Sequence, residues 1–513
     1  MTGLDGLLAR FDAPGRPDEP AFLGPDGRVL LRRGELAAQI RAAAGAYARA
    51  GFAPGARVAF GVRQDADGIP WLLGAFRAGI VPVVLETGLS PATLVDRVRT
   101  AGVEAIVTDG RVATVLHHPV LRWLAARRGL ALPAPRELAE VTWTTSFAPA
   151  RVRRLDRLAG GDARRSLDGR APALVVFTSG TTGAPRGVVY GGDGLAALME
   201  AAERFIELPG DAVVLGSALH LTVPALLAGV PVVLADPRDP ARLAAMVRRL
   251  GISHVSLPAQ RALAFARAGG RTRLLLLGSA PVRNVTLREL VELMPGTEIR
   301  LIYGMSEYLL VAAMDAGERL AYDERGGDLV GRPIGGVRLR IATDGELHVG
   351  GPALALGYLG GALPVDELAS GDIARFDASG RLVLVGRRKE MLIRTGENIY
   401  PALYEALLAD GADLDAAVMV GLPDVHADEM VVLFAVPRAG QDPEAARARL
   451  ASLVASPASP LDRHARPDVI LGLEVLPRSG RSGKPDRREL VRIAAARLGR
   501  PAPDDPLLPE QPA

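Results

Sequence analysis

A segment rich in glycine and threonine, Phe177–Gly187, carries groups suited to holding a polyphosphate. Gly180 and Gly183 permit positive φ and close approach of a ligand to the backbone. Successive backbone N–H groups can form an anion-binding nest, and Arg186 adds a fixed positive charge. The segment lacks the Lys-Ser/Thr end of a Walker loop, and we expect a strand to follow it. The residues expected around the phosphates are Thr178, Ser179, Gly180, Thr181, Thr182 and Gly183.

Such a string also occurs in ordinary polar hairpin loops, which is its commoner explanation when it stands alone. Two further segments follow expected strands. Leu277–Pro281 comes after a buried-type strand at Arg273–Leu277, and Tyr303–Glu307 ends the next strand, Arg300–Tyr303. Both lie at carboxyl ends of strands, where open α/β sheets bind ligands. A carboxylate beside phosphates, such as that of Glu307, suits Mg²⁺.

Three segments nearer the C-terminus complete the set: Ser370–Asp372, Gly386–Pro401 and Pro477–Lys484. An isolated Asp or Arg in a loop is normally a solvated residue, but here the order and spacing of the segments form a pattern. The pattern resembles the adenylate-forming superfamily, which includes acyl- and aryl-CoA synthetases, luciferases and the adenylation domains of peptide synthetases. The resemblance extends from about residue 30 to about residue 490.

The resemblance implies an adenine site made by two segments. The backbone after Leu277 would pack on the base, with Ser279 in place of a second glycine, and Tyr303 would stack on it. Ser306 would contact the α-phosphate, and Glu307 with Thr182 would hold Mg²⁺. The residues assigned to the nucleotide in the two segments are Gly278, Ser279, Ala280, Pro281, Tyr303, Gly304, Met305, Ser306 and Glu307.

The C-terminal segments would complete the site. Asp372 would accept hydrogen bonds from both ribose hydroxyls, a task suited to the two oxygens of a carboxylate. Arg387 would also bond the ribose. By the resemblance Glu390 stands at the hinge between two domains, and Gly396 lies in the loop that lines a tunnel for the pantetheine arm of CoA. Lys484 would bridge the substrate carboxylate and the α-phosphate.

The composition supports the assignment of Lys484. Of the 61 basic residues only Lys389 and Lys484 are lysines, which leaves 61 − 2 = 59 arginines. A lysine therefore stands where the family requires a compact, mobile ammonium rather than a planar guanidinium. Arg186 departs from the family, which usually has lysine at this place in the loop. His220 falls where the family has an aromatic or histidine gate beside the acyl site, although a core or surface histidine explains it equally well.

The intervening sequence alternates between strand and helix patterns, which predicts an α/β protein. Arg273–Leu277, Leu287–Met294 and Arg300–Tyr303 form a compact βαβ unit. After about residue 386 a shorter α/β series begins, with its last helix near Arg487–Leu498. We therefore expect a large N-terminal domain of stacked sheets and helices (1–388), a small mobile α/β domain that carries Lys484 (391–500) and a disordered tail (501–513).

Composition excludes several other classes. The chain has 513 residues, no cysteine and a net charge of +3, so disulfides, thiolate metal sites and cysteine nucleophiles are excluded. No basic stretch is interleaved with aromatic residues, so we expect no nucleic-acid partner. The N-terminus does not read as a signal peptide. The longest apolar run, Leu221–Ala235, is too short to span a bilayer, so we expect a cytoplasmic enzyme without a transmembrane segment.

The resemblance implies that ATP and Mg²⁺ activate a carboxylic acid as an acyl-adenylate and that the acyl group then passes to the thiol of CoA. Arg186, Lys484 and His220 would be the catalytic residues. One alternative is another acceptor: a carrier-protein phosphopantetheine, an amine, or an internal hydroxyl as in β-lactone formation. A second is a nucleotide-binding protein that retains the fold without turnover. Leu219, Leu309 and Leu310 favour a fatty or aryl acid over an amino acid.

Overall fold

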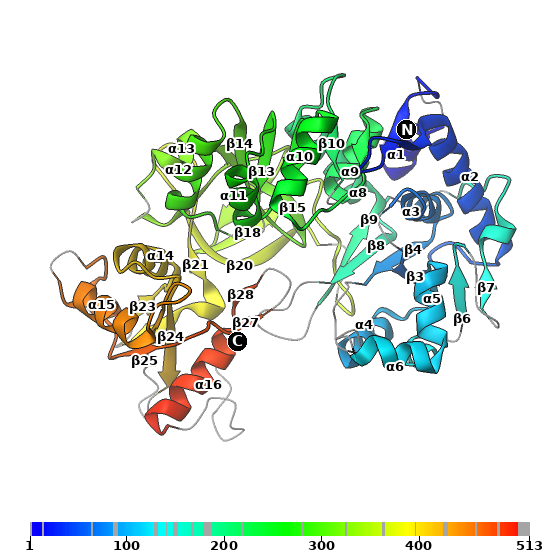
Figure 1. Ribbon diagram of the computed structural model, residues 1–513. Coiled ribbons are helices and arrows are strands. Elements are labelled where there is room, and N and C mark those ends of the chain that lie inside the picture. Colours follow the sequence, from blue (N-terminus) through cyan, green and yellow to red (C-terminus); the bar gives the residue numbers. More distant parts are fainter. Residues whose placement is uncertain are drawn as a thin grey trace.

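The computed structural model describes most of the chain, and its arrangement is shown in Figure 1. The described residues are 3–12, 15–62, 65–85, 91–127, 132–139, 141–146, 152–165, 169–177, 186–216, 219–278, 281–323, 326–361, 365–394, 397–423, 429–456, 459–479 and 483–500. Two large sheets with helices around them form the N-terminal part, and a smaller α/β unit follows. The predicted α/β class is confirmed.

The larger sheet has 13 strands, and its middle carries the predicted βαβ unit. In sheet order its strands are β17 (Arg338–Ile341), β18 (Glu346–Gly350), β20 (Glu367–Phe376), β21 (Leu382–Arg387), β16 (Asp328–Pro333), β15 (Tyr308–Asp315), β14 (Glu298–Met305), β13 (Leu274–Leu277), β12 (His254–Ser256), β10 (Val214–Leu215), β11 (Val232–Val233), β1 (Pro20–Leu23) and β2 (Val29–Arg32). From β14 to β1 the neighbours are parallel, and from β14 to β17 they are antiparallel.

The four leucines of β13 explain why this strand lies inside the sheet. Successive side chains of a strand point to opposite faces. Leu274 and Leu276 enter a core shared with α2 (Arg33–Arg49), α3 (Gly68–Arg77), α8 (Gly192–Ile206) and α9 (Leu219–Leu227). Leu275 and Leu277 enter a second core on the other face, under α10 (Pro240–Leu250), α11 (Ala259–Arg267) and α12 (Asn284–Leu293). An unbroken apolar run is therefore what a strand covered on both faces requires.

The second sheet has eight strands. At one edge lies β19, next to β9, the strand that follows the Gly/Thr segment. Its order is β19 (Gly357–Tyr358), β9 (Gly187–Gly191), β8 (Pro172–Phe177), β4 (Val81–Val84), β3 (Arg57–Gly61), β5 (Ala105–Thr108), β6 (Val141–Thr144) and β7 (Arg153–Arg154). The strand predicted after the Gly/Thr segment is β9, which pairs antiparallel with β8. Beyond it, β19 pairs with β9, so a segment near residue 358 is brought beside residue 188.

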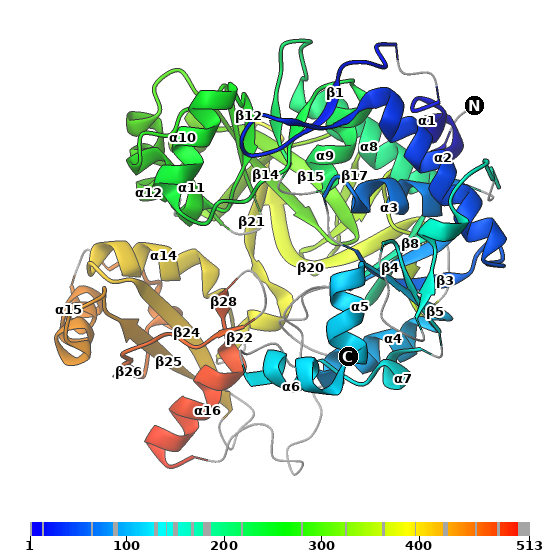
Figure 2. The same cartoon turned by 45° about the vertical axis from the view of Figure 1, so that its right-hand side comes forward.

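The C-terminal unit is built around a three-stranded sheet, β24 (Ala416–Pro423), β25 (Glu429–Val436) and β26 (Val469–Gly472). Helices α14 (Ala402–Gly411) and α15 (Pro443–Ala455) share one apolar core with this sheet, and α16 (Arg487–Leu498) shares the other. Figure 2 shows this unit below the larger sheet. An ion pair between Arg283, beside α12, and Asp410, on α14, joins the two parts.

Most of the elements predicted along the chain are present, and α16 has its predicted bounds. Strand β26 ends at Gly472, although Leu473 and Leu476 beyond its end still insert into the core. The apolar run from Leu221 includes most of α9, which contains Pro224. None of the helices in the described ranges is long and apolar enough to cross a membrane.

Candidate active site

Within the Gly/Thr segment the structure describes Phe177, the last residue of β8, and the residues from Arg186, which immediately precedes β9. Several predicted binding residues lie outside the described residues: Thr178, Ser179, Gly180, Thr181, Thr182, Gly183, Ser279, Ala280 and Gly396. Arg186 is described. Its guanidinium lies over the ring of Tyr358, with its Cζ 5.0 Å from the ring centroid. Gly278 and Pro281 border the gap after β13, and a Cβ on Gly278 would lie 3.4 Å from the carbonyl oxygen of Ile302.

The turn from β14 into β15 carries the predicted Tyr303–Glu307 segment, and its backbone is closely held. A Cβ on Gly304 would lie 1.9 Å from the carbonyl oxygen of Leu309, so only glycine fits this position without a backbone shift. The Tyr190 hydroxyl donates to the carbonyl oxygen of Ser306 at 2.8 Å. The amide of Ala355 donates to the carbonyl oxygen of Glu307 at 2.9 Å. Met305 is half-buried and ends β14.

Glu307 is fixed through its side chain as well. The Tyr358 hydroxyl donates to Glu307 Oε1 at 2.7 Å. Tyr358 therefore contacts both Glu307 and Arg186. Burial raises the pKa of Tyr358, and the adjacent Glu307 carboxylate raises it further, while Arg186 opposes both effects. The tyrosine thus remains a protonated hydrogen-bond donor over the ordinary pH range.

A second cluster joins Tyr303 to the two residues predicted for the ribose. Asp372 and Arg387 are direct neighbours on the paired strands β20 and β21. Arg387 Nε lies 2.8 Å from Asp372 Oδ1, and the Tyr303 hydroxyl donates to Oδ2 at 2.6 Å. Only 4% of Asp372 is exposed. Burial raises the pKa of Asp372, and the charge of Arg387 and the hydrogen bond from Tyr303 partly offset this.

Lys484 lies beside this cluster although it belongs to the C-terminal unit. It begins β28 (Lys484–Pro485), which pairs with β27 (Arg478–Ser479) in a small hairpin. Figure 1 shows the hairpin reaching toward β20. Burial and the charge of Arg387 lower the pKa of Lys484, and the carboxylates of Glu390 and Asp372 counteract this. The ammonium is therefore close enough to both carboxylates to interact with their charges.

The segment around Glu390, the predicted hinge position, is held from both sides. Glu390 forms an ion pair with Arg487 at 3.1 Å, and Arg487 also binds Glu405 at 2.8 Å, so Glu390 is tied to the first turn of α16. Its neighbour Arg388 pairs with Glu346 on β18, in the larger sheet. The segment that follows β21 thus connects the large sheet to the unit that carries Lys484.

His220 stands in the first turn of α9. Burial lowers its pKa to about 4, so the imidazole is neutral at pH 7. Leu219 beside it packs on the same apolar core as Tyr303, Met305 and Leu309. A neutral ring at this place can shape an acyl pocket, but it cannot supply positive charge.

The residues present fit Mg²⁺ carried by a nucleotide better than a resident metal ion. Within the described ranges, no group of three or more His, Asp or Glu side chains is placed to hold a metal. Glu307 offers one carboxylate in a polar turn. Mg²⁺ is commonly held by one or two carboxylates together with substrate phosphates and water, so a single carboxylate is sufficient when ATP supplies the other ligands.

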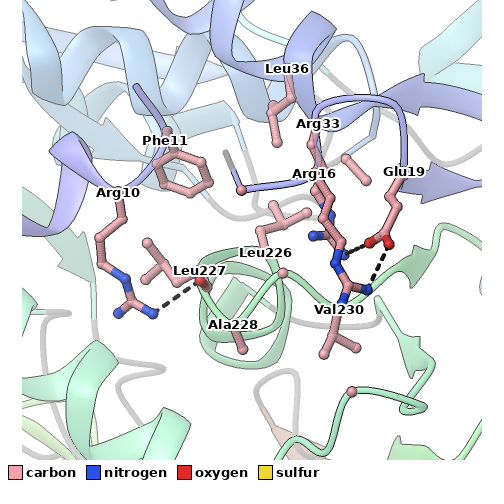
Figure 3. Close-up of a pocket in the computed structure, with 14 residues that line it drawn as sticks. Arg10, Phe11, Arg16, Glu19, Arg33, Leu36, Leu226, Leu227, Ala228 and Val230 are labelled. Carbon is pink, nitrogen blue, oxygen red and sulfur yellow. Dashed lines mark hydrogen bonds and ion pairs between the residues drawn. The ribbon is translucent and has the colours of Figure 1, made fainter. Parts of the chain in front are cut away.

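A cavity of about 380 Å³ lies elsewhere, between the N-terminal segment, α2 and the end of α9 (Figure 3). Leu36 and Leu227 line part of it. Its polar lining is largely paired with itself, because Arg16 and Arg33 each bind Glu19 at 2.8 Å. The cavity contains none of the predicted site residues, so we do not assign it to the candidate site.

Neither Tyr358 nor Tyr190 is among the site residues predicted from the sequence. Tyr358 is placed by the pairing of β19 with β9, and the contact of Tyr190 with Ser306 joins residues 116 positions apart, so both arrangements span a long sequence separation. The position of each tyrosine within a short β-type run is the only local signal, and it does not identify a partner. The clusters Tyr303–Asp372–Arg387 and Arg186–Tyr358–Glu307 thus join predicted residues through contacts that sequence alone does not show.

The fold is that of adenylate-forming enzymes, and comparison with known proteins identifies the family. Residues 10–359 match the AMP-binding enzyme family, and the chain belongs to that family. Asp372, Arg387 and Lys484 lie beyond the matched range. The predicted resemblance to the superfamily is confirmed.

Two curated relatives and one solved structure are similar to this chain. The chain is 30% identical to an indoleacetate–CoA ligase from Aromatoleum aromaticum over 63% of this chain and 68% of the relative. It is 27% identical to a salicyl-AMP ligase / salicyl-S-ArCP synthetase from Mycobacterium tuberculosis, over 94% and 87%. The fold is similar to that of an amide bond synthetase from Marinactinospora thermotolerans, with a TM-score of 0.77 and 23% identity over 94% and 98% of the two chains.

Proposed function

We propose that this enzyme uses ATP to activate a carboxylic acid as an acyl-adenylate, releases pyrophosphate, and transfers the acyl group to the thiol of CoA. The observation that carries this proposal is the convergence of Tyr303, Asp372 and Arg387 with Lys484 nearby. A tyrosine ring, a carboxylate with two acceptor oxygens and two cations suit a nucleoside phosphate. They come from β14, β20, β21 and β28, which are separate in sequence.

In the first half-reaction a carboxylate oxygen attacks the α-phosphorus of ATP and pyrophosphate leaves. Both reactants are anions, so the protein must neutralise charge and align them. Lys484 would bridge the acid and the α-phosphate, and Arg186 would face the leaving phosphates. Glu307 with Thr182 would hold Mg²⁺, which supplies further positive charge when bound. Asp372 would accept bonds from the ribose hydroxyls, with Arg387 beside it.

In the second half-reaction the thiol attacks the acyl carbon, the carbon–oxygen bond to AMP breaks, and AMP leaves. Lys484 must then leave the site. We propose that the chain divides near Glu390 into a domain of residues 1–388 and a mobile domain of 391–500, and that the second rotates between the steps. The carriage of Lys484 on the C-terminal unit supports this proposal. Gly396 would then line the approach of the pantetheine arm.

For the acceptor of the acyl group there are two specific alternatives to CoA. CoA is favoured by the indoleacetate–CoA ligase among the relatives. The salicyl-S-ArCP synthetase, which resembles nearly the whole chain, favours a carrier-protein phosphopantetheine. The amide bond synthetase has a similar fold, and an amine acceptor is therefore the third possibility to be assayed.

The acid is proposed to be a fatty or aryl acid. Leu310 is buried in the core that α9 shares with the larger sheet, and Leu219 and Leu309 pack against the same core. These side chains favour an apolar acyl group over a charged one. His220 would form part of the wall beside the acid.

The proposal is tested by incubating the protein with ATP, Mg²⁺ and a panel of fatty, aryl and hydroxy acids, with and without CoA, while pyrophosphate and acyl products are measured. We expect acid-dependent pyrophosphate release, acyl-CoA formation, and loss of pyrophosphate release in Lys484→Ala. Lys389→Ala is the matched control, because Lys389 is the other lysine and is exposed. Adenylate without thioester would reject CoA as acceptor, and product with a carrier protein or amine would replace it. Pyrophosphate release that is unaffected in Lys484→Ala would contradict the assigned role of this lysine.

A further inference from the structure

The strand pair β9–β19 connects the exit of the Gly/Thr segment to the turn that carries Glu307. Arg186 immediately precedes β9, and Tyr358 ends β19. In the antiparallel pairing Tyr358 lies opposite Val188. This register places the tyrosine ring close enough to the start of β9 for Arg186 to fold over it.

Tyr358 contacts the two predicted groups in different ways. Its hydroxyl donates to Glu307 Oε1 at 2.7 Å, while its ring faces the Arg186 guanidinium at 5.0 Å. A planar guanidinium stacks on an aromatic ring more effectively than a compact ammonium does. The ring therefore offers a platform suited to the arginine that this chain carries where its family usually has lysine.

The hydrogen bond from Tyr358 also orients the Glu307 carboxylate. It engages one carboxylate oxygen, Oε1, and thereby orients the other. The backbone around the carboxylate is held by Tyr190 at Ser306 O and by Ala355 at Glu307 O. A group fixed at three points loses little conformational freedom when it binds a cation, so its geometry is set before the nucleotide arrives.

We propose that Tyr358 is a positioning residue that orients Glu307 toward nucleotide-bound Mg²⁺ and holds Arg186 at the phosphates. This inference rests on the proposed function, because it assumes that the site binds ATP with Mg²⁺.

The first test measures binding of ATP by calorimetry, as a function of Mg²⁺ concentration and in EDTA, for the full chain. Tyr358→Phe keeps the ring and removes the hydroxyl. We expect the Mg²⁺ concentration for half-maximal enhancement of ATP binding to rise about tenfold, because one hydrogen bond to a charged group is lost. Binding of ATP in EDTA should stay unchanged, because the platform for Arg186 remains.

Tyr404→Phe is the matched control. The Tyr404 hydroxyl donates to the Asp462 carboxylate at 2.7 Å, so this variant loses the same kind of bond within the C-terminal unit. Thermal unfolding of both variants separates loosening of the fold from a change at the site. We expect Tyr404→Phe to leave the Mg²⁺ titration as in the wild type. Equal Mg²⁺ titrations for Tyr358→Phe and the wild type would overturn the assignment to Glu307.

A double-substitution cycle tests the contact with Arg186. In EDTA, Arg186→Lys should weaken ATP binding several-fold when Tyr358 is present and much less when Tyr358 is leucine. Equal effects in the two backgrounds would refute the platform. Wild-type protein that binds no ATP with Mg²⁺ would instead defeat the proposed function. If the wild type binds ATP with Mg²⁺ and Tyr358→Phe has the same Mg²⁺ titration as the wild type, only the role of the tyrosine is refuted.

Discussion

Replacing Asp372 with asparagine should weaken nucleotide binding without weakening the fold. Asparagine has nearly the same shape and keeps an oxygen that can accept from Tyr303, now 2.6 Å away. It removes the negative charge 2.8 Å from Arg387 Nε. It also supplies only one acceptor oxygen where two ribose hydroxyls are proposed to donate.

The magnitude follows from the hydrogen bonds at stake. A hydrogen bond to a charged group contributes about 1.5–3 kcal/mol, so losing one such bond to the ribose weakens ATP binding roughly 10- to 100-fold. The free energy of unfolding of the ligand-free protein, in contrast, should not fall. Burial raises the pKa of Asp372, which means that its partners do not fully offset the cost of burying the charge. Arg387 is 45% exposed, so water can solvate it once the carboxylate is gone.

The contribution of Asp372 to the free energy of unfolding depends on pH. A carboxyl whose folded-state pKa is raised binds its proton more tightly in the native state than in the unfolded chain. Stability from this group is therefore present at low pH and declines as pH rises from its ordinary value of 3.8 through the raised pKa. Asp372→Asn should remove that decline, so the ligand-free variant should be at least as stable as the wild type at pH 7.

Two measurements decide this prediction: calorimetric binding of ATP and urea unfolding of the ligand-free protein, each for wild type and Asp372→Asn. Weaker binding with unreduced unfolding free energy is the expected pair of results. A variant that loses several kcal/mol of stability, or one that binds ATP as the wild type does, would refute the reasoning.

Two further substitutions test other parts of the site. Gly304→Ala should lose activity and about 1–3 kcal/mol of stability, because its Cβ would lie 1.9 Å from Leu309 O. Activity assays and urea unfolding test this, and a variant with wild-type activity and stability would contradict it. His220→Gln tests the lowered pKa of about 4. The unfolded chain binds this proton more readily, so the wild type should lose up to about 3 kcal/mol as pH falls from about 6.5 to 4, and the variant should lose correspondingly less. Identical pH dependence of unfolding in the two proteins would contradict this.

Much of the fold could be predicted because its signals are local. The all-leucine run of β13 is typical of a strand covered on both faces, and the structure divides its side chains between two cores. The bounds of α16 agree because Asp486 caps its start and Gly499 has the left-handed conformation that ends a helix. The strand predicted after the Gly/Thr segment is β9 for the same local reason, a short β-branched run.

The site could be predicted only in part, because its contacts are not local. Residue types and order indicated Tyr303, Asp372 and Arg387. Their contacts depend on how one large sheet brings β14 together with the paired strands β20 and β21, from which β14 is separated by β15 and β16. The contact of Tyr358 with Glu307 was not predicted because the two residues are 51 positions apart and no local pattern connects them. The roles proposed for Lys484, Arg186 and His220 stay predictions.

The central claim is that the acid oxygen attacks the α-phosphorus of ATP. It is tested most directly with an acid that supports turnover, labelled with ¹⁸O in both carboxylate oxygens, followed by mass spectrometry of the AMP, pyrophosphate and acyl product. The account predicts one ¹⁸O in AMP and none in pyrophosphate, because the bridging oxygen leaves with AMP when the acceptor attacks the acyl carbon. Label in pyrophosphate or inorganic phosphate, or AMP without label, would contradict it.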